Sequence, residues 1–336
     1  MKKKNLLLLA IFLLVLIITL VYGISILEKN NNKFSHPKNI TISQAFQHLL
    51  YIGLYVADQN GYFTDENINV KIETAGGDAQ AFAALASGNA DFAQGDPAFV
   101  AIANEKGWQG KVIAMPVNRV AIWGVTFDTT IQKFSSPESF KGYTVATYPE
   151  PNTSYVIQKQ LALRANLDLE KDIKILQVPF GTELATLKNN QADIAQTIEP
   201  NVTQVEQQGG KVVFSYPEAW GELAFTGLMT SEKLIENDSG LVQGVINAYE
   251  KALNFVHSQP DSTVIIAKKY LPDLDSEIIR TALNRLVASK CIPKTTIVEK
   301  ESWRKLLDIR IEVGDLDSLP KKDLIDNRFS LQAASQ

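Results

Sequence analysis

Apolar and polar residues follow two periods along the chain, one typical of strands and one of helices. Short segments in which apolar and polar residues alternate, such as residues 68–74, predict strands, and segments with apolar residues three or four positions apart, such as residues 276–288, predict amphipathic helices. The two kinds alternate, which indicates an α/β fold with helices on both faces of a sheet. The predicted strands are residues 39–43, 68–74, 112–116, 120–127, 143–147, 173–178 and 223–230, and the predicted helices are residues 49–60, 78–87, 153–165, 240–257, 261–270, 276–288 and 299–311.

One helix–turn–strand pattern occurs twice. Residues 85–94 and residues 187–196 form the two copies, followed by Asp96-Pro97 and Glu199-Pro200. In each copy the acidic residue and proline stand where the next helix begins. In open α/β sheets, ligands bind beyond the carboxyl ends of the strands, beside those helix N-termini. The duplication therefore predicts two similar lobes with a cleft at Asp96 and Glu199; the alternative is that both residues only cap their helices.

The N-terminal segment is strongly apolar. Residues 6–27 follow Lys2, Lys3 and Lys4, and at about 1.5 Å per residue they are long enough to cross a bilayer of about 30 Å. The lysines place everything after residue 28 outside the cytoplasm. Residues 1–28 are therefore predicted to be a membrane anchor or a signal peptide, with the anchor favoured because a cleavage pattern is poorly developed. Residues 29–38 are predicted to form a tether.

Composition excludes several classes of function. After the three N-terminal lysines, 33 − 3 = 30 Lys and Arg face 37 Asp and Glu, and no basic patch indicates binding to nucleic acid. The one cysteine, Cys291, permits neither a disulfide framework nor a cysteine metal site, and is expected to be a small buried residue. His36, His48 and His257 lack metal-ligand spacing, and no serine lies in a nucleophile motif. We expect no metal, no cofactor and no catalysis.

Several segments together resemble the nitrate/sulfonate/taurine-type substrate-binding proteins of ABC importers, a family that includes binders of thiamine-precursor pyrimidines and of riboflavin. The resemblance runs from about Ile40 to the C-terminal helices. It is carried by YIGLYVA at residues 51–57, GYF at 61–63, INV at 68–70, GG at 76–77, ALASGNADF at 84–92 and SFKGYTVA at 139–146.

The resemblance implies a type II periplasmic-binding-protein fold, in which the chain crosses between two α/β lobes twice. We expect crossings near residues 127–131 and 222–226. Lobe 1 would then hold residues 39–127 plus 223–329, lobe 2 residues 128–222, and residues 330–336 would form a disordered tail. The implied function is capture of a small organic solute, an aminopyrimidine, a flavin or a sulfonate-like molecule, by a monomer that delivers it to an ABC permease and its ATPase.

Candidate ligand groups lie in loops at the predicted carboxyl ends of strands. Residues 152–154 form a polar helix N-terminus that could bind an oxyanion or could simply cap the helix. By resemblance, Glu199 matches a position where an acidic residue often faces the ligand, which would suit an amine or a ring edge. Arg119 is the only arginine in these loops, which disfavours bare nitrate or sulfate. The candidates are Ser43, Gln44, Phe46, His48, Gln94, Gly95, Asp96, Asn118, Arg119, Tyr148, Asn152, Thr153, Ser154, Phe180, Glu199 and Trp220.

Two alternatives remain from other classes. The exported domain could be a membrane-tethered sensor that passes ligand occupancy to a membrane partner. It could also be a thiamine-pyrimidine biosynthesis enzyme of the same fold, although the cysteine-rich iron motif of that branch is missing here.

Overall fold

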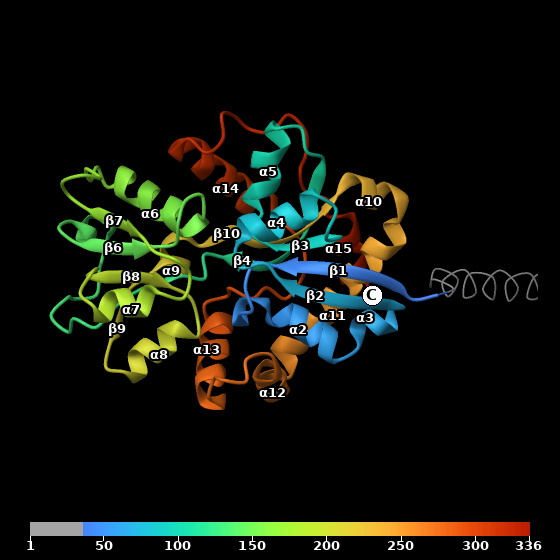
Figure 1. Cartoon of the computed structure of the whole chain (residues 1–336), viewed down its shortest axis with the longest axis horizontal. Coiled ribbons are helices and arrows are strands. Elements are labelled where there is room, and N and C mark those ends of the chain that lie inside the picture. Colours follow the sequence, from blue (N-terminus) through green and yellow to red (C-terminus); the bar gives the residue numbers. More distant parts are fainter. Residues whose placement is uncertain (1–35) are drawn as a thin grey trace, which may run out of the picture.

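The computed structural model of the chain describes residues 36–336. The predicted anchor or signal peptide, residues 1–28, and most of the predicted tether lie outside the described residues. No helix within residues 36–336 has the length and apolar character that a membrane crossing requires. The described chain forms two α/β lobes, each built on a five-stranded sheet (Figure 1).

The first lobe contains a sheet with the strand order β2-β1-β3-β10-β4. Strand β1 pairs in parallel with β2 and β3, and β10 pairs antiparallel with β3 and β4. Parallel neighbours require helical crossovers, which cover the faces of the sheet. The strands are β1 (Lys38–Gln44), β2 (Ile68–Thr74), β3 (Phe92–Gly95), β4 (Gly110–Arg119) and β10 (Glu222–Ser231), and the helical segments between β1 and β4 are η1 (Leu49–Tyr51), α2 (Ile52–Gln59), α3 (Tyr62–Asp65), α4 (Asp78–Ala86) and α5 (Ala98–Glu105).

The second lobe repeats this topology with the order β7-β6-β8-β5-β9. Here β6 pairs in parallel with β7 and β8, and β5 pairs antiparallel with β8 and β9. The strands are β5 (Trp123–Thr126), β6 (Thr144–Thr147), β7 (Lys174–Gln177), β8 (Ile194–Thr197) and β9 (Lys211–Ser215), and the helical segments are η2 (Pro137–Phe140), α6 (Thr153–Arg164), α7 (Glu183–Lys188), α8 (Asn201–Gln207) and α9 (Tyr216–Trp220).

The two sequence repeats occupy equivalent places in the two sheets. The Asp91 carboxylate accepts a hydrogen bond from the backbone N–H of Thr41 in β1 at 2.8 Å. The Asp193 carboxylate accepts one from the backbone N–H of Thr144 in β6 at 2.7 Å. In both lobes an aspartate therefore satisfies a donor of the neighbouring strand just before the strand of the repeat begins, which explains why this residue recurs.

The chain crosses between the lobes at two adjacent points. Arg119 at the end of β4 pairs with Glu222 at the start of β10. The first crossing is residues 120–122, and the expected position at residues 127–131 is wrong because β5 already pairs with β8 and β9 of the second sheet. The second crossing lies at Gly221, between α9 and β10, just before the expected segment.

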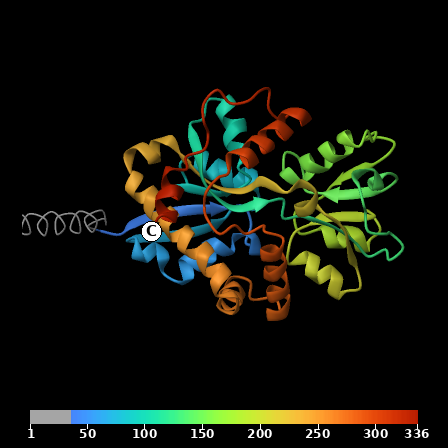
Figure 2. The same cartoon turned by 180° about the vertical axis from the view of Figure 1, so that it is seen from behind.

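Helices from the C-terminal part of the chain bridge the lobes. Helix α14 contacts β10 and α5 in lobe 1 and α6 in lobe 2, while α13 contacts α12 and η1 in lobe 1 and α8 in lobe 2. Figure 2 shows α14 beside α6 and α13 beside α8, seen from behind. The remaining helices are α10 (Glu232–Asn237), α11 (Ser239–Ser258), α12 (Pro260–Tyr270), α13 (Ser276–Ala288), α14 (Lys300–Val313) and α15 (Arg328–Ala334).

The predicted disordered tail, residues 330–336, is wrong. Helix α15 packs against α11, and the Ser330 hydroxyl donates to the carbonyl of Ile113 at 3.0 Å. Phe329 and Ala333, four positions apart, lie on one face of the helix and are buried. Their burial offsets the cost of ordering an otherwise polar segment.

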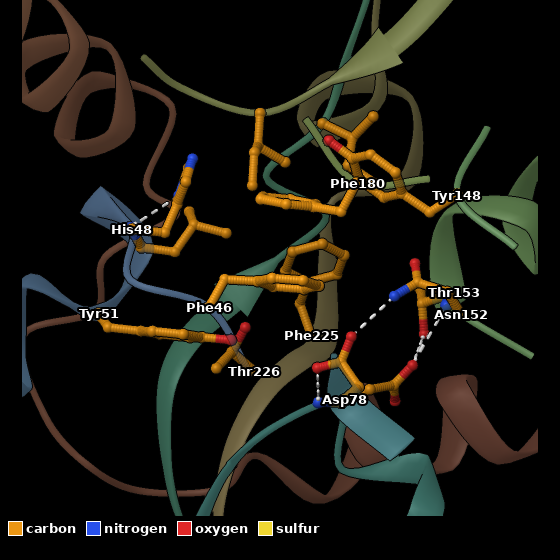
Figure 3. Close-up of a pocket in the computed structure, with 14 residues that line it drawn as sticks. Phe46, His48, Tyr51, Asp78, Tyr148, Asn152, Thr153, Phe180, Phe225 and Thr226 are labelled. Atoms are coloured by element: carbon orange, nitrogen blue, oxygen red, sulfur yellow. Dashed lines mark hydrogen bonds between the residues drawn. The ribbon is translucent and has the colours of Figure 1, made fainter. Parts of the chain in front are cut away.

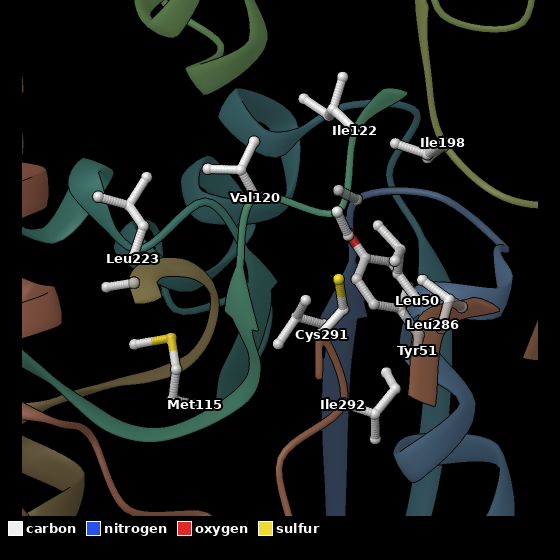
Figure 4. Close-up of a cluster of buried hydrophobic side chains, with 14 of the residues drawn as sticks. Leu50, Tyr51, Met115, Val120, Ile122, Ile198, Leu223, Leu286, Cys291 and Ile292 are labelled. Carbon is white, nitrogen blue, oxygen red and sulfur yellow. The ribbon is translucent and has the colours of Figure 1, made fainter. Parts of the chain in front are cut away.

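A buried hydrophobic cluster fills the space between the crossing segments and the C-terminal helices (Figure 4). Val120 and Ile122 from the first crossing, Leu223 from β10, and Leu286 and Cys291 are all buried members of this cluster. The expectation that Cys291 is a small buried residue is confirmed, and burial raises the pKa of its thiol to about 12.

Candidate functional site

A small cavity of about 40 Å³ lies between the lobes, near the carboxyl ends of strands from both sheets (Figure 3). This volume holds only a few water molecules, so the lobes are closed over very little space. The lining residues are Phe46, His48, Leu50, Tyr51, Asp78, Asp96, Ile122, Tyr148, Asn152, Thr153, Phe180, Ile198, Phe225 and Thr226.

Two phenylalanine rings meet across the cleft. Phe46 follows β1 in lobe 1 and Phe180 follows β7 in lobe 2, and their rings stack with centroids 3.7 Å apart at 15°. Both rings line the cavity and also an outer groove of about 290 Å³. The pair therefore separates the cavity from the groove, and any separation of the lobes that parts these rings opens a flat slot between them.

The aromatic wall of lobe 2 is fixed by a buried carboxylate. Tyr148 lies 5.0 Å from Phe180, measured between ring centroids. Its hydroxyl donates to the carboxylate of Glu183 at 2.6 Å, which also accepts from Thr197 at 3.1 Å. Burial, followed by the charge of Glu183, raises the pKa of the Tyr148 hydroxyl well above its ordinary value. Tyr148 is therefore a neutral ring held in one orientation.

The polar end of the cavity contains two aspartates from lobe 1. One Asp78 carboxylate oxygen accepts from the backbone N–H of Asp96 at 2.9 Å, and the other accepts from the side-chain amide of Asn152 in lobe 2 at 2.8 Å. Gly95 permits this approach, because a Cβ at that position would lie 2.6 Å from the Asp78 carboxylate. The side chain of Asp78 thus spans the cleft.

A buried arginine joins the second aspartate to both lobes. Asp96 Oδ2 accepts from Thr153 Oγ1 at 2.5 Å, from Thr153 N–H at 3.2 Å and from Arg310 Nη2 at 2.6 Å. Arg310 lies in α14, is fully buried, and also donates to the carbonyl of Pro151 at 2.5 Å and to Asp315 at 2.7 Å. One guanidinium therefore ties lobe 1, lobe 2 and the C-terminal segment together.

Burial shifts two titrating groups that line the cavity. Burial, followed by repulsion from Asp96, raises the pKa of Asp78 to about 7, and Arg310 and the hydrogen bonds only partly oppose this shift. Burial lowers the pKa of His48 to about 3, so this imidazole is neutral at pH 7. The Nδ1 atom of His48 accepts from the backbone N–H of Leu50 at 3.4 Å, which leaves the proton on Nε2.

The raised pKa of Asp78 predicts a pH-dependent stability. A carboxyl group whose pKa is raised by folding stabilises the fold at low pH, and this contribution is lost as pH rises through about 7. Asp78→Asn removes the titration. From pH 5 to pH 8, the free energy of unfolding of the wild type should fall by about 2 kcal/mol relative to that of the variant. The full effect would be about 1.4 kcal/mol per unit of pKa shift, and the smaller value allows for the partial exposure of Asp78. Urea denaturation at both pH values measures it, and a difference independent of pH would contradict the shift.

The structure brings fewer than half of the sequence candidates to the cavity. Those that line it are Phe46, His48, Asp96, Tyr148, Asn152, Thr153 and Phe180. Those that do not line it are Ser43, Gln44, Gln94, Gly95, Asn118, Arg119, Ser154, Glu199 and Trp220.

Several candidates outside the lining hold the site together instead. Ser154 accepts from the backbone N–H of Tyr148 at 3.0 Å. Gln44 accepts from the Tyr55 hydroxyl at 2.9 Å, and Gln94 accepts from the Tyr249 hydroxyl at 2.5 Å.

Other candidates lie away from the cavity. Ser43 is a buried strand residue. The Asn118 N–H donates to the carbonyl of Cys291 at 3.1 Å, and Arg119 lies at the crossing. Trp220 lies under the cationic side chains of Arg164 and Lys305.

The structure corrects the expected orientation of Glu199. Its carboxylate is buried, accepts from Thr203 at 2.9 Å and pairs with Arg285 Nε of α13 at 2.9 Å. Burial raises the pKa of Glu199, although Arg285 opposes the shift. Both repeat acids therefore pair with arginines of the C-terminal helices, Asp96 with Arg310 and Glu199 with Arg285, and only Asp96 faces the cavity.

The Glu199 pair predicts a loss of stability upon substitution. Glu199→Gln is expected to lower the free energy of unfolding by about 1–3 kcal/mol, because a buried charged hydrogen bond is lost. Glu206→Gln is the matched control: Glu206 pairs with the same arginine, but its side chain is 39% exposed, so the loss should stay below about 1 kcal/mol. Chemical denaturation measures both, and equal losses would contradict the assignment.

Seven lining residues were not among the sequence candidates: Leu50, Tyr51, Asp78, Ile122, Ile198, Phe225 and Thr226. Asp78 stands at the start of α4, where a helix-capping role is common, yet its side chain makes no cap and reaches across the cleft instead. The signal available in the sequence was its position directly after Gly76-Gly77 and the predicted carboxyl end of a strand, the same criterion that selected Asp96.

The chain is similar to known proteins over most of its length. A family model described as "NMT1/THI5 like" matches residues 49–263. YtlA of Bacillus subtilis (strain 168) is 22% identical over 307 residues, which are 88% of this chain and 90% of YtlA.

Solved structures share the fold. A ligand-binding component of an ABC-type import system from Staphylococcus aureus has a TM-score of 0.71 at 13% identity, over 88% of this chain and 99% of that one. The periplasmic aliphatic sulphonate-binding protein SsuA from Escherichia coli has a TM-score of 0.70 at 18% identity, over 89% and 100%. The expected two-lobed periplasmic-binding-protein fold is confirmed.

Proposed function

Because the chain belongs to the NMT1/THI5-like family, we propose that it is the extracytoplasmic solute-binding component of an ABC importer and carries out no catalysis. The observation that carries the proposal is the cavity between the lobes, to which both lobes contribute walls. A solute held there by both lobes stabilises the closed form, which a permease can then distinguish from the open form. The apolar N-terminal segment would keep the protein at the membrane.

The chemistry of the cavity supports a planar ring that carries N–H donors, such as an aminopyrimidine. Phe46 and Phe180 offer parallel flat faces, and stacking of a ring between aromatic side chains is favourable. Asp78 offers carboxylate oxygens at the polar end, and charge-assisted hydrogen bonds to such oxygens are strong. A ring donor would replace Asn152 as a partner of Asp78.

The stacked pair predicts that truncating either phenylalanine weakens solute binding by a similar factor. Phe46→Ala and Phe180→Ala are each expected to weaken the binding of an aminopyrimidine about tenfold or more, since stacking of a base on an aromatic side chain contributes about 1–3 kcal/mol. Phe99→Ala is the control, because Phe99 lines the outer groove and not the cavity, and its effect should stay within about threefold. Titration calorimetry measures all three. A Phe99 effect as large as the other two would place the ring in the groove.

A thermal-shift screen of the full chain in detergent tests the function itself. The panel holds aminopyrimidines, riboflavin, taurine, alkanesulfonates and nitrate. A bound solute at a hundred times its Kd adds about 2.7 kcal/mol of stability, which raises the melting temperature visibly. We expect shifts from ring compounds; a folded protein that responds to no small molecule would contradict a solute-binding role.

A further inference from the structure

Lobe 2 presents a group of hydrogen-bond donors that is typical of an anion site. At the start of α6, a helix of 12 residues, the N–H of Thr153 belongs to the first turn, whose N–H groups have no partner within the helix, and it donates to Asp96 at 3.2 Å. The Thr153 hydroxyl and Arg310 Nη2 point to the same place, since both contact one oxygen atom of Asp96. Three donors, one of them cationic, converge on a single acceptor.

The acceptor is an internal carboxylate from the other lobe. Asp96 is 4% exposed, Thr153 2% and Arg310 0%, so the contact excludes solvent. The Nε atom of Arg310 is also buried and has no hydrogen-bond partner within residues 36–336, which leaves the guanidinium with unused donor capacity. A sulfonate or sulfate oxygen would need the same donors in the same place.

The rest of the cavity supplies no second cation for a solute anion. Asp78 lies beside Asp96 and accepts from its backbone N–H. The linings of the cavity and of the outer groove, as far as the described residues form them, include neither lysine nor arginine. A free anion would therefore find its binding position occupied by the carboxylate of Asp96, with the carboxylate of Asp78 beside it.

We propose that Asp96 determines the solute specificity of the cleft by occupying an oxyanion position at the N-terminus of α6, and so excludes sulfonates and similar anions. The inference rests on the proposal that the cavity is a solute site. It makes Asp96 a specificity residue that acts by repulsion and by filling space, while Asp78 makes the attractive contact. Removing the carboxylate should then turn the same donors into an anion site.

The test is Asp96→Ser in the full chain, in detergent, titrated with sulfate and with methanesulfonate. Serine keeps a hydroxyl for the backbone N–H of Ala98, which Asp96 caps at 2.9 Å, but it removes the charge and frees space. Asp96→Asn is the control, because it removes the charge and leaves the position filled. We expect Asp96→Ser to bind methanesulfonate at least tenfold more tightly than the wild type, and Asp96→Asn to gain less than threefold.

A second substitution links the gain to the proposed donors. Adding Arg310→Met to Asp96→Ser should abolish the anion binding. A folded Asp96→Ser protein that binds neither anion more tightly than the wild type would overturn the inference. An Asp96→Ser protein that stays unfolded in saturating sulfate would also overturn the inference, because a free anion should replace the lost carboxylate. Binding of ring compounds by the wild type is measured separately, so failure here and failure of the proposed function are distinguishable.

Discussion

Arg310→Met is expected to lower the free energy of unfolding by about 3–5 kcal/mol, because it leaves the buried carboxylate of Asp96 without its cation. The substitution also removes the contacts to Asp315 and to the carbonyl of Pro151. Methionine retains much of the aliphatic volume, so the effect reports on the lost charge and hydrogen bonds more than on packing. Urea denaturation monitored by circular dichroism measures it.

An exposed ion pair between α6 and α14 is the control. Arg164 of α6 pairs with Glu312 of α14 at 3.1 Å, and the two side chains are 55% and 45% exposed. Arg164→Met should therefore cost less than about 1 kcal/mol. If both arginine variants lost the same stability, the buried contact of Arg310 would not be what joins the lobes.

Asp78→Asn is expected to weaken the binding of an aminopyrimidine about 100-fold. Removing one partner of a buried charged hydrogen bond costs about 2–5 kcal/mol of binding free energy. Asparagine keeps an oxygen for the backbone N–H of Asp96 but replaces an acceptor with a donor. The affinity of the wild type should also fall as pH drops below about 7, where Asp78 takes up a proton. Calorimetric titrations at pH 6 and pH 8 measure both effects.

Glu150 provides the control for this prediction. It lines the outer groove and not the cavity, so Glu150→Gln removes a nearby charge without touching the proposed acceptor. Its effect on affinity should stay within about threefold. An Asp78→Asn protein that binds the ring as tightly as the wild type would rule out Asp78 as the acceptor.

The fold could be predicted from the sequence because its signals are local. Apolar runs and helical periodicity placed most strands and helices within a few residues, and helix α13 has the predicted bounds. The repeated segment predicted the two similar sheets because Asp91 and Asp193 satisfy the same strand donor in each. The first crossing was misplaced because β4 and β5 read as two strands of one lobe, and hydrophobicity does not show which sheet a strand joins.

The site could be predicted only in part because its decisive contacts are distant in sequence. Asp96 and Glu199 occupy equivalent places in the repeats, and spacing alone makes both look like ligand contacts. Arg310 lies 214 positions from Asp96, and Arg285 lies 285 − 199 = 86 positions from Glu199. These pairings decide which acid faces the cavity, and no local pattern around either acid indicates them. Asp78 resembles an ordinary helix-capping residue for the same reason.

The central claim is that the cleft, with Phe46 and Phe180 parted, holds a planar solute with N–H donors between these two rings. Titration calorimetry of the full chain with an aminopyrimidine and with methanesulfonate tests it most directly. We predict that the ring compound binds with a negative heat-capacity change, as expected for apolar burial, and that methanesulfonate gives no binding. Tight binding of methanesulfonate, with none of the ring compound, would contradict the account.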